Sequence, residues 1–110
     1  KVGLLDERYF AYLEDAEYCQ RVKKAGWKVI YVPTGYLWHK VSQTSKSGGD
    51  LNDYFLTRNR MLFGLKHASA RTKFALIRES IRLFLSGRKW QKVGIRDFYL
   101  RRFAKGSFWK

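Results

Sequence analysis

Apolar residues recur at helical spacing in three long segments of the chain. Between Leu51 and His67 they fall at positions 51, 55, 62 and 65, and between residues 70 and 85 they include Phe74, Ile77 and Ile81. Residues 89–104 mix apolar and basic side chains in a similar way. Recurrence at i, i+3 and i+4 is typical of amphipathic helices. We therefore expect helices near residues 51–67, 71–86 and 89–103.

A fourth helix is expected near residues 15–25, where the acidic run 14–17 is followed by basic residues and Gly26. Acid at the start and base at the end suit the helix dipole, and glycine commonly follows a helix end. Helical spacing places Asp15 and Cys19 on one apolar face. It places Glu17 and Arg21 on the other side, where they form an i, i+4 pair expected to face solvent.

Asp15 has two interpretations. It could cap the helix, because aspartate is a favoured N-cap residue. It could instead point into a cleft from a rigid helix start and act as a general base.

Two segments have the composition of strands. Residues 27–32 and 36–41 are rich in aromatic and β-branched side chains, and the turn-forming residues 33–35 separate them. With the four helices they predict an α/β fold that is mainly helical, with two short strands. His39, near the end of the second segment, could be a hydrogen-bonded structural histidine, because the two histidines of the chain are too few for a metal site of their own.

Arg58 falls within the apolar stripe of the helix at 51–67. A buried guanidinium requires partners, so carboxylates or a phosphate are expected around it. The alternative is that the side chain reaches the edge of the stripe and stays solvated.

The charge of the chain is unevenly distributed. The net charge is +14, and residues 66–110 carry 13 Lys and Arg against two acids. This asymmetry indicates an anionic partner for the C-terminal part. We therefore divide the chain into residues 1–65 and a basic helical extension at residues 66–110. The single cysteine excludes an intrachain disulfide and fits a reducing compartment.

The order of short motifs resembles the C-terminal part of the catalytic domain in family 2 glycosyltransferases, which have a GT-A fold. The matching motifs are Gly3-Leu4-Leu5-Asp6-Glu7 with Phe10-Ala11-Tyr12, then Glu14-Asp15-Ala16-Glu17-Tyr18-Cys19-Gln20-Arg21 with Ala25-Gly26, then Val32-Pro33 with His39, Ser42 and Ser45, and finally Tyr54 with Arg58-Asn59. The last motif is similar to one in bacterial rhamnosyltransferases. Glu17 departs from the family pattern, where aspartate is commoner, and beyond residue 60 only a loose likeness remains.

The resemblance implies roles for individual residues. Asp15 is expected to be the catalytic base, while Glu14, Trp38 and Arg58 are expected to bind substrate. His39 is expected to ligate a divalent metal, Mn²⁺ or Mg²⁺. The family's nucleotide-binding half would precede this region, so residues 1–110 alone are expected to be inactive.

The function expected from the resemblance is that of an inverting glycosyltransferase. It would move sugar from a nucleotide-sugar donor to a glycan or lipid-linked acceptor in bacterial cell-wall or polysaccharide synthesis. The expected location is cytoplasmic, with peripheral contact at the inner face of the membrane. The alternative is a basic aromatic module that binds nucleic acid or an anionic membrane surface; no recognised nucleic-acid signature accompanies it.

Overall fold

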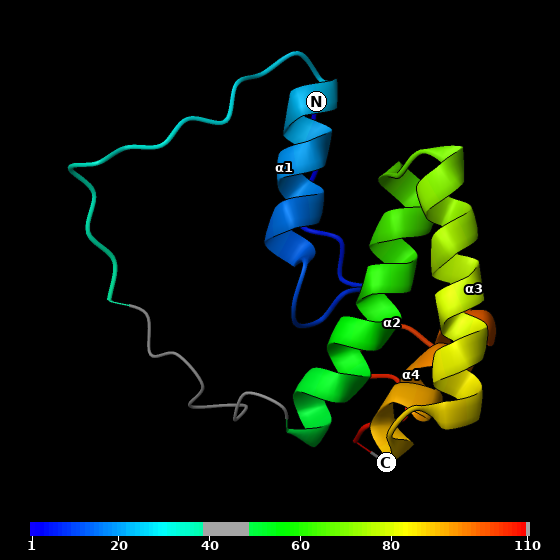
Figure 1. Ribbon diagram of the computed structural model, residues 1–110. Coiled ribbons are helices and arrows are strands. Elements are labelled where there is room, and N and C mark those ends of the chain that lie inside the picture. Colours follow the sequence, from blue (N-terminus) through cyan, green and yellow to red (C-terminus); the bar gives the residue numbers. More distant parts are fainter. Residues whose placement is uncertain (39–48, 110) are drawn as a thin grey trace.

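The computed structural model describes residues 1–38 and 49–109, and within them the chain forms four helices (Figure 1). The bounds of these helices are Glu14–Lys24 (α1), Asp50–His67 (α2), Ala70–Ser86 (α3) and Lys89–Tyr99 (α4). Helices α2, α3 and α4 pack against one another, and α1 lies on the opposite side of α2 from α3 (Figure 1).

All four predicted helices are confirmed, with one difference at the end of α4. This helix was expected to reach residue 103 but ends at Tyr99. The chain turns there because Arg101 adopts a left-handed conformation with φ 55°, and its neighbour Arg102 donates its backbone N–H to the Asp97 carbonyl at 2.8 Å. The turn brings residues 102–104 back across the bundle, where the Ala104 N–H bonds to the Arg8 carbonyl at 3.0 Å.

The end of α1 follows its sequence signal closely. Gly26 has φ 86°, its N–H bonds to the Lys23 carbonyl at 3.0 Å, and the N–H of Trp27 bonds to the Val22 carbonyl at 3.1 Å. This pair of bonds is the Schellman arrangement that satisfies the last carbonyls of a helix.

The core of the bundle depends on a close approach between α2 and α4. A Cβ on Gly94 would lie 2.7 Å from the Tyr54 carbonyl oxygen, so only glycine fits at this crossing. Met61, Leu76 and Ile95 form the buried cluster that joins α2, α3 and α4. The absence of a side chain at Gly94 lets the two backbones meet, and Ile95 then reaches the cluster.

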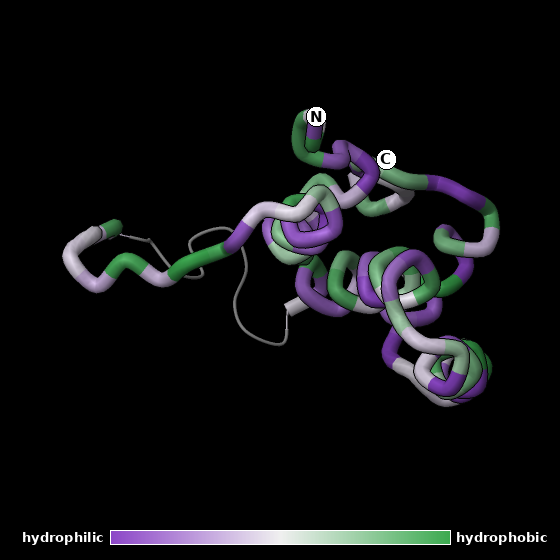
Figure 2. The backbone as a smooth tube through the Cα atoms, turned by 90° about the horizontal axis from the view of Figure 1, so that it is seen from above, coloured by the Kyte–Doolittle hydropathy of each residue, from purple (hydrophilic) through white to green (hydrophobic). Residues whose placement is uncertain are grey.

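The predicted strands are wrong for the residues that the structure describes, and the described chain is all-helical, not α/β. Residues 27–38 contain no strand, only the turn at residues 33 and 34, which is closed by a bond of 3.3 Å from Gly35 N to Val32 O. Residues 39–41, the end of the second predicted strand, lie outside the described residues. Residues 27–38 extend away from the helices in both views (Figures 1 and 2). A strand requires a neighbouring strand that bonds its backbone, and residues 27–38 have no such strand beside them among the described residues.

The fold does not test the predicted division of the chain at residue 65. The boundary falls inside α2, and α4 of the basic extension packs along this helix.

Candidate functional site around the start of α1

The loop before α1 has an unusual backbone. Phe10, Tyr12 and Leu13 all adopt left-handed conformations, with φ of 61°, 68° and 67°. Bulky residues rarely take this conformation, which costs about 1–3 kcal/mol each and persists only where surrounding contacts enforce it. Leu13 is the N-cap of α1, and no side chain caps the helix. The strained loop therefore sets the position of the two residues that follow it, Glu14 and Asp15.

Arg58 of α2 supplies part of the contacts that hold this loop. Its guanidinium is fully buried and donates to the carbonyls of Arg8 and Tyr9, both at 3.1 Å. It also donates to the Ala104 carbonyl at 2.8 Å. The aromatic ring of Phe55 lies against it, 4.9 Å from ring centroid to guanidinium carbon. Arg58 thus joins the N-terminal loop to the segment after α4.

The partners of Arg58 differ from the expected ones. The prediction of a buried, partnered guanidinium is confirmed, and the alternative of a solvated one is wrong. The hydrogen-bond partners, however, are mainly main-chain carbonyls and not a carboxylate or phosphate. Burial lowers the pKa of Arg58, and the nearby Tyr54 hydroxyl and Asp97 carboxylate partly offset this shift. The substrate-binding role of Arg58 stays a prediction, and its geometry is that of a structural residue.

Asn59 of α2 supplies further hydrogen bonds that hold this loop. Its side-chain amide donates to the carbonyls of Tyr9 at 2.8 Å, Ala11 at 2.6 Å and Tyr12 at 2.9 Å. Because one amide gathers three carbonyls of the same loop, it fixes the loop's curvature directly. We call Arg58 and Asn59 the clamp.

Glu17 lies on the inward face of α1, so its expected place on the solvent side is wrong. The residue is fully buried, and its carboxylate accepts hydrogen bonds from Arg21 Nε at 2.8 Å and Lys66 Nζ at 2.5 Å. The His67 ring is also close, with Nε2 at 3.4 Å from Glu17 Oε1. Burial and the nearby Lys24 ammonium lower the pKa of His67. The i, i+4 pair of Glu17 with Arg21 is confirmed, and two residues of α2 draw it inward.

Asp15 faces away from this network and is exposed. Its predicted place on an inward apolar face is therefore wrong, and so is the cap interpretation, since Leu13 is the N-cap. The Asp15 carboxylate accepts from the Ala16 N–H at 2.7 Å. A carboxylate held at a helix start but open to solvent is accessible to a substrate hydroxyl.

Glu14 lines a shallow cavity of about 670 Å³, and Asp15 is not among the residues of its wall. The opposite wall comes from residues 103–106, the segment that Arg58 ties to the loop. The Oε2 atom of Glu14 is buried and has no hydrogen-bond partner among the described residues. An unpaired acceptor beside a cavity is suited to a hydroxyl donor such as a sugar.

Two other predicted site residues, Trp38 and His39, are not part of the described cavity wall. Trp38 is at the end of the extended segment and is 97% exposed. His39, the predicted metal ligand, lies outside the described residues. Among residues 1–38 and 49–109, no three side chains of His, Cys, Asp or Glu come together in a way that could hold a metal ion. The described residues alone therefore do not form the expected metal site.

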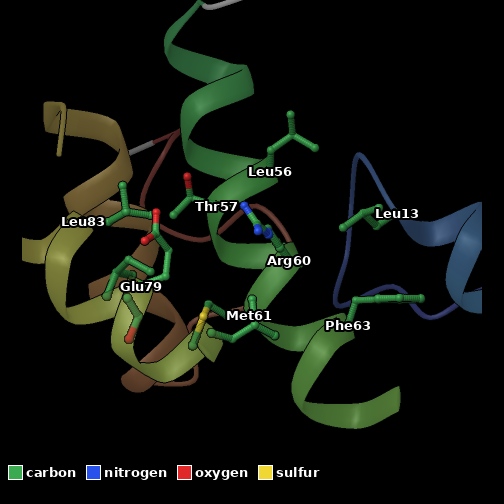
Figure 3. Close-up of a pocket in the computed structure, with 11 residues that line it drawn as sticks. Leu13, Leu56, Thr57, Arg60, Met61, Phe63, Glu79 and Leu83 are labelled. Carbon is green, nitrogen blue, oxygen red and sulfur yellow. The ribbon is translucent and has the colours of Figure 1, made fainter. Parts of the chain in front are cut away.

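A second cavity, of about 350 Å³, lies between α2 and α3 and has a mainly apolar lining (Figure 3). Leu13 reaches it from the start of α1, and Met61 and Leu83 line it from the bundle. Arg60 and Glu79 are the charged residues in its wall, on α2 and α3 (Figure 3).

Two features of the site escaped the sequence reasoning. The motif that contains Asn59 predicts no role for this residue, and helical spacing does not predict the burial of Glu17. The adjacent Arg58-Asn59 pair in an otherwise apolar stripe was the available signal, because buried polar side chains must find partners.

Two known proteins are similar to part of the chain. Both are described as N-acetylglucosaminyl-diphospho-decaprenol L-rhamnosyltransferase, from Mycobacterium tuberculosis strains CDC 1551 / Oshkosh and ATCC 25618 / H37Rv. Each is 47% identical over 47 residues, which is 42% of this chain. The chain spans 15% of the length of these relatives.

The similarity relates part of the chain to a glycosyltransferase. No protein-family profile matches the chain. No solved structure matches it either.

Proposed function

We propose that the chain is the acceptor-side part of an inverting glycosyltransferase that moves sugar from a nucleotide-sugar donor to a lipid-linked acceptor. The single observation that carries this proposal is the partial similarity to a rhamnosyltransferase acting on a diphospho-decaprenol acceptor. The geometry supports it, because the clamp fixes the loop before α1, and Glu14, the first residue of that helix, lines a cavity.

Asp15 is the proposed general base. An acceptor hydroxyl is a weak nucleophile until its proton is removed during attack. The Asp15 carboxylate would take that proton as the hydroxyl oxygen bonds to the anomeric carbon of the donor. The bond from this carbon to the nucleoside diphosphate breaks at the same time, and attack from the opposite face inverts the configuration. Exposure leaves the carboxylate of Asp15 open to an approaching acceptor.

Glu14 is the proposed acceptor-positioning residue. Its unpaired Oε2 would accept a hydrogen bond from a second hydroxyl of the acceptor sugar. Residues 103–106 would close the other side of the cavity, so the segment after α4 would contribute to the acceptor site.

The divalent metal stays a prediction, with His39 as one ligand. Mn²⁺ or Mg²⁺ would neutralise charge on the departing diphosphate. The described residues supply no ligand cluster, so none of the steps above depends on the metal.

The proposal is tested with the complete gene product, a labelled nucleotide-activated rhamnose and N-acetylglucosaminyl-diphospho-decaprenol. Asp15→Asn should lower turnover by about 10²–10⁴-fold, the usual contribution of a positioned base. Its melting temperature should not change, because Asp15 is exposed and asparagine keeps a side-chain oxygen that can accept the Ala16 N–H. Asp50→Asn is the matched control, since Asp50 is also an exposed acid in a first helical turn.

Near-normal turnover of Asp15→Asn would remove Asp15 as the base. Failure of the unaltered protein to transfer sugar from any nucleotide-sugar donor would contradict the proposed function as a whole.

A further inference from the structure

The outer face of α3 carries an apolar stripe that nothing in the described structure covers. Its residues are Phe74, Ile77, Ile81, Phe84 and Leu85, and each is at least 42% exposed. The buried side of the same helix is formed by Leu76, Ser80 and Leu83. Helix α3 therefore has two apolar faces, of which only one packs in the bundle. Seen from above, α3 lies at the outer edge of the molecule (Figure 2).

The stripe continues onto α4. Tyr99 and Leu100 are each 55% exposed, and together with α3 they line an apolar cavity of about 360 Å³. The Tyr99 hydroxyl hydrogen-bonds Ser80 at 2.8 Å. Its polar atom is thus satisfied within the protein, and its ring remains on the surface. We call these seven residues of α3 and α4 the outer apolar face.

Basic residues border the outer apolar face along one side. Helical spacing places Arg71, Arg78 and Arg82 in one row next to the stripe, and all three are exposed. Glu79 is the only acid in α3 and forms an ion pair with Arg82 at 2.6 Å. The side chain of Arg96 on α4 also lines the cavity.

We infer that the outer apolar face docks on an anionic lipid bilayer, with α3 lying in the plane of the membrane surface. An amphipathic helix with an apolar stripe and a bordering row of arginines is suited to insert shallowly at the headgroup boundary. The arginines would then meet lipid phosphates, each attracted by the negative surface potential. None of the described helices is long and apolar enough to cross a bilayer, so the contact would be along the surface.

Charge favours this partner over two others. Pairing of two copies through α3 would bring like-charged arginine rows together, which opposes a dimer. Nucleic acid would satisfy the arginines, but its bases stack on aromatic rings and offer little surface to the aliphatic Ile77, Ile81 and Leu85. A bilayer with acidic headgroups matches both the stripe and its border.

The inference is tested by sedimentation of the intact protein with phosphatidylcholine vesicles, with and without phosphatidylglycerol. We expect binding to the anionic vesicles that weakens as salt is raised. The double variant Ile81→Glu/Phe84→Glu should bind at least about tenfold more weakly, because it removes apolar area and adds repulsion. The control Ile30→Glu/Val32→Glu alters two similarly exposed residues of the extended segment and should bind as the unaltered protein does.

A second variant separates charge from folding. Arg71→Glu/Arg78→Glu leaves the apolar stripe in place and should lose the preference for phosphatidylglycerol, while its helical circular dichroism stays the same. Equal binding of the unaltered protein to both kinds of vesicle would overturn the inference. So would unchanged binding of the Ile81→Glu/Phe84→Glu variant. Absence of vesicle binding would also overturn it, whether the face proved to mediate a dimer or binding to a single-stranded oligonucleotide. No outcome depends on sugar transfer, so the docking surface and the proposed enzyme activity can fail separately.

Discussion

Lys66 donates a hydrogen bond of 2.5 Å to Glu17, which joins α1 to the end of α2. The two residues are 49 positions apart, and Glu17 is fully buried. Lys66 Nζ also lies 3.5 Å from Asp6, so one ammonium contacts both α1 and the segment before it. The position of α1 therefore depends on a carboxylate that helical pattern alone assigns to the surface.

Replacing Glu17 tests this dependence. Glu17→Gln removes a buried negative charge, which leaves Arg21 without this counter-ion and Lys66 with Asp6 at 3.5 Å. We expect a loss of about 1–3 kcal/mol in the free energy of unfolding, measured by urea denaturation. Glu79→Gln is the control, because Glu79 also pairs with an arginine but is only half-buried, and it should leave the midpoint unchanged. Equal effects of the two changes would contradict a structural role for Glu17.

Acid should destabilise the fold through the same carboxylates. A hydrogen bond from Arg8 lowers the pKa of Asp6 to about 2 from its ordinary 3.8. Burial opposes ionisation of Glu17, but hydrogen bonds from Lys66 and Arg21 outweigh it and lower the pKa below 4.5. The unfolded chain therefore binds more protons, and the stabilisation present above these ordinary values is lost as pH falls through the lowered ones.

We accordingly expect the melting temperature to fall between about pH 5 and pH 2. The Glu17→Gln variant should show a shallower fall, because it no longer contributes one of the two carboxylates. A melting temperature that rose over this range would contradict the ion-pair account.

Arg58→Lys distinguishes a structural role from substrate binding. A lysine ammonium is a single point and does not reach the loop at residues 8–9 and the segment at 102–104 together. We expect a loss of about 2–4 kcal/mol in the free energy of unfolding, since several buried carbonyls lose their donor. Arg60→Lys, an exposed change on the same helix, should have no effect on unfolding. Unchanged stability of Arg58→Lys with reduced sugar transfer would instead favour the substrate-binding prediction.

Gly94→Ala tests the close crossing of α2 and α4. The added Cβ would lie 2.7 Å from the Tyr54 carbonyl oxygen, a main-chain atom that cannot turn aside. We expect a loss of about 1–3 kcal/mol despite the better helix propensity of alanine. Gly35→Ala is the control, because its Cβ would meet the nearest atom at an ordinary 3.7 Å. Thermal unfolding of both variants measures the difference.

The helices could be predicted from sequence because their signals are local. Apolar spacing identified α2 and α3, and Gly26 marked the end of α1. The prediction of strands at residues 27–38 failed because the signal for a strand is not local. The side chains of this segment favour a strand, but a strand exists only when another strand bonds its backbone, and composition does not reveal whether that neighbour is present.

The site was only partly predictable. Glu14 and Asp15 were singled out by motif; Glu14 lines a cavity and Asp15 is exposed, and their roles stay predictions. The i, i+4 geometry of Glu17 with Arg21 was also predictable, whereas its inward orientation depends on Lys66, a contact distant in sequence. The clamp could not be predicted from the sequence because its partners are main-chain carbonyls, which every residue carries. Only the left-handed backbone of Phe10, Tyr12 and Leu13 brings those carbonyls within reach of Arg58 and Asn59.

The bond from Arg58 to the Ala104 carbonyl has a consequence for the order in which the chain acquires its shape. Residues 8–13 leave the ribosome about ninety residues before one of the segments that share their arginine. Until residue 104 is free, the loop before α1 lacks the neighbour with which it shares Arg58. Late contacts between distant segments are slow to form because the intervening chain must first be closed. The region that presents Asp15 should thus be among the last to become ordered during synthesis, and ribosome-bound chains halted before residue 104 should leave it open to proteases.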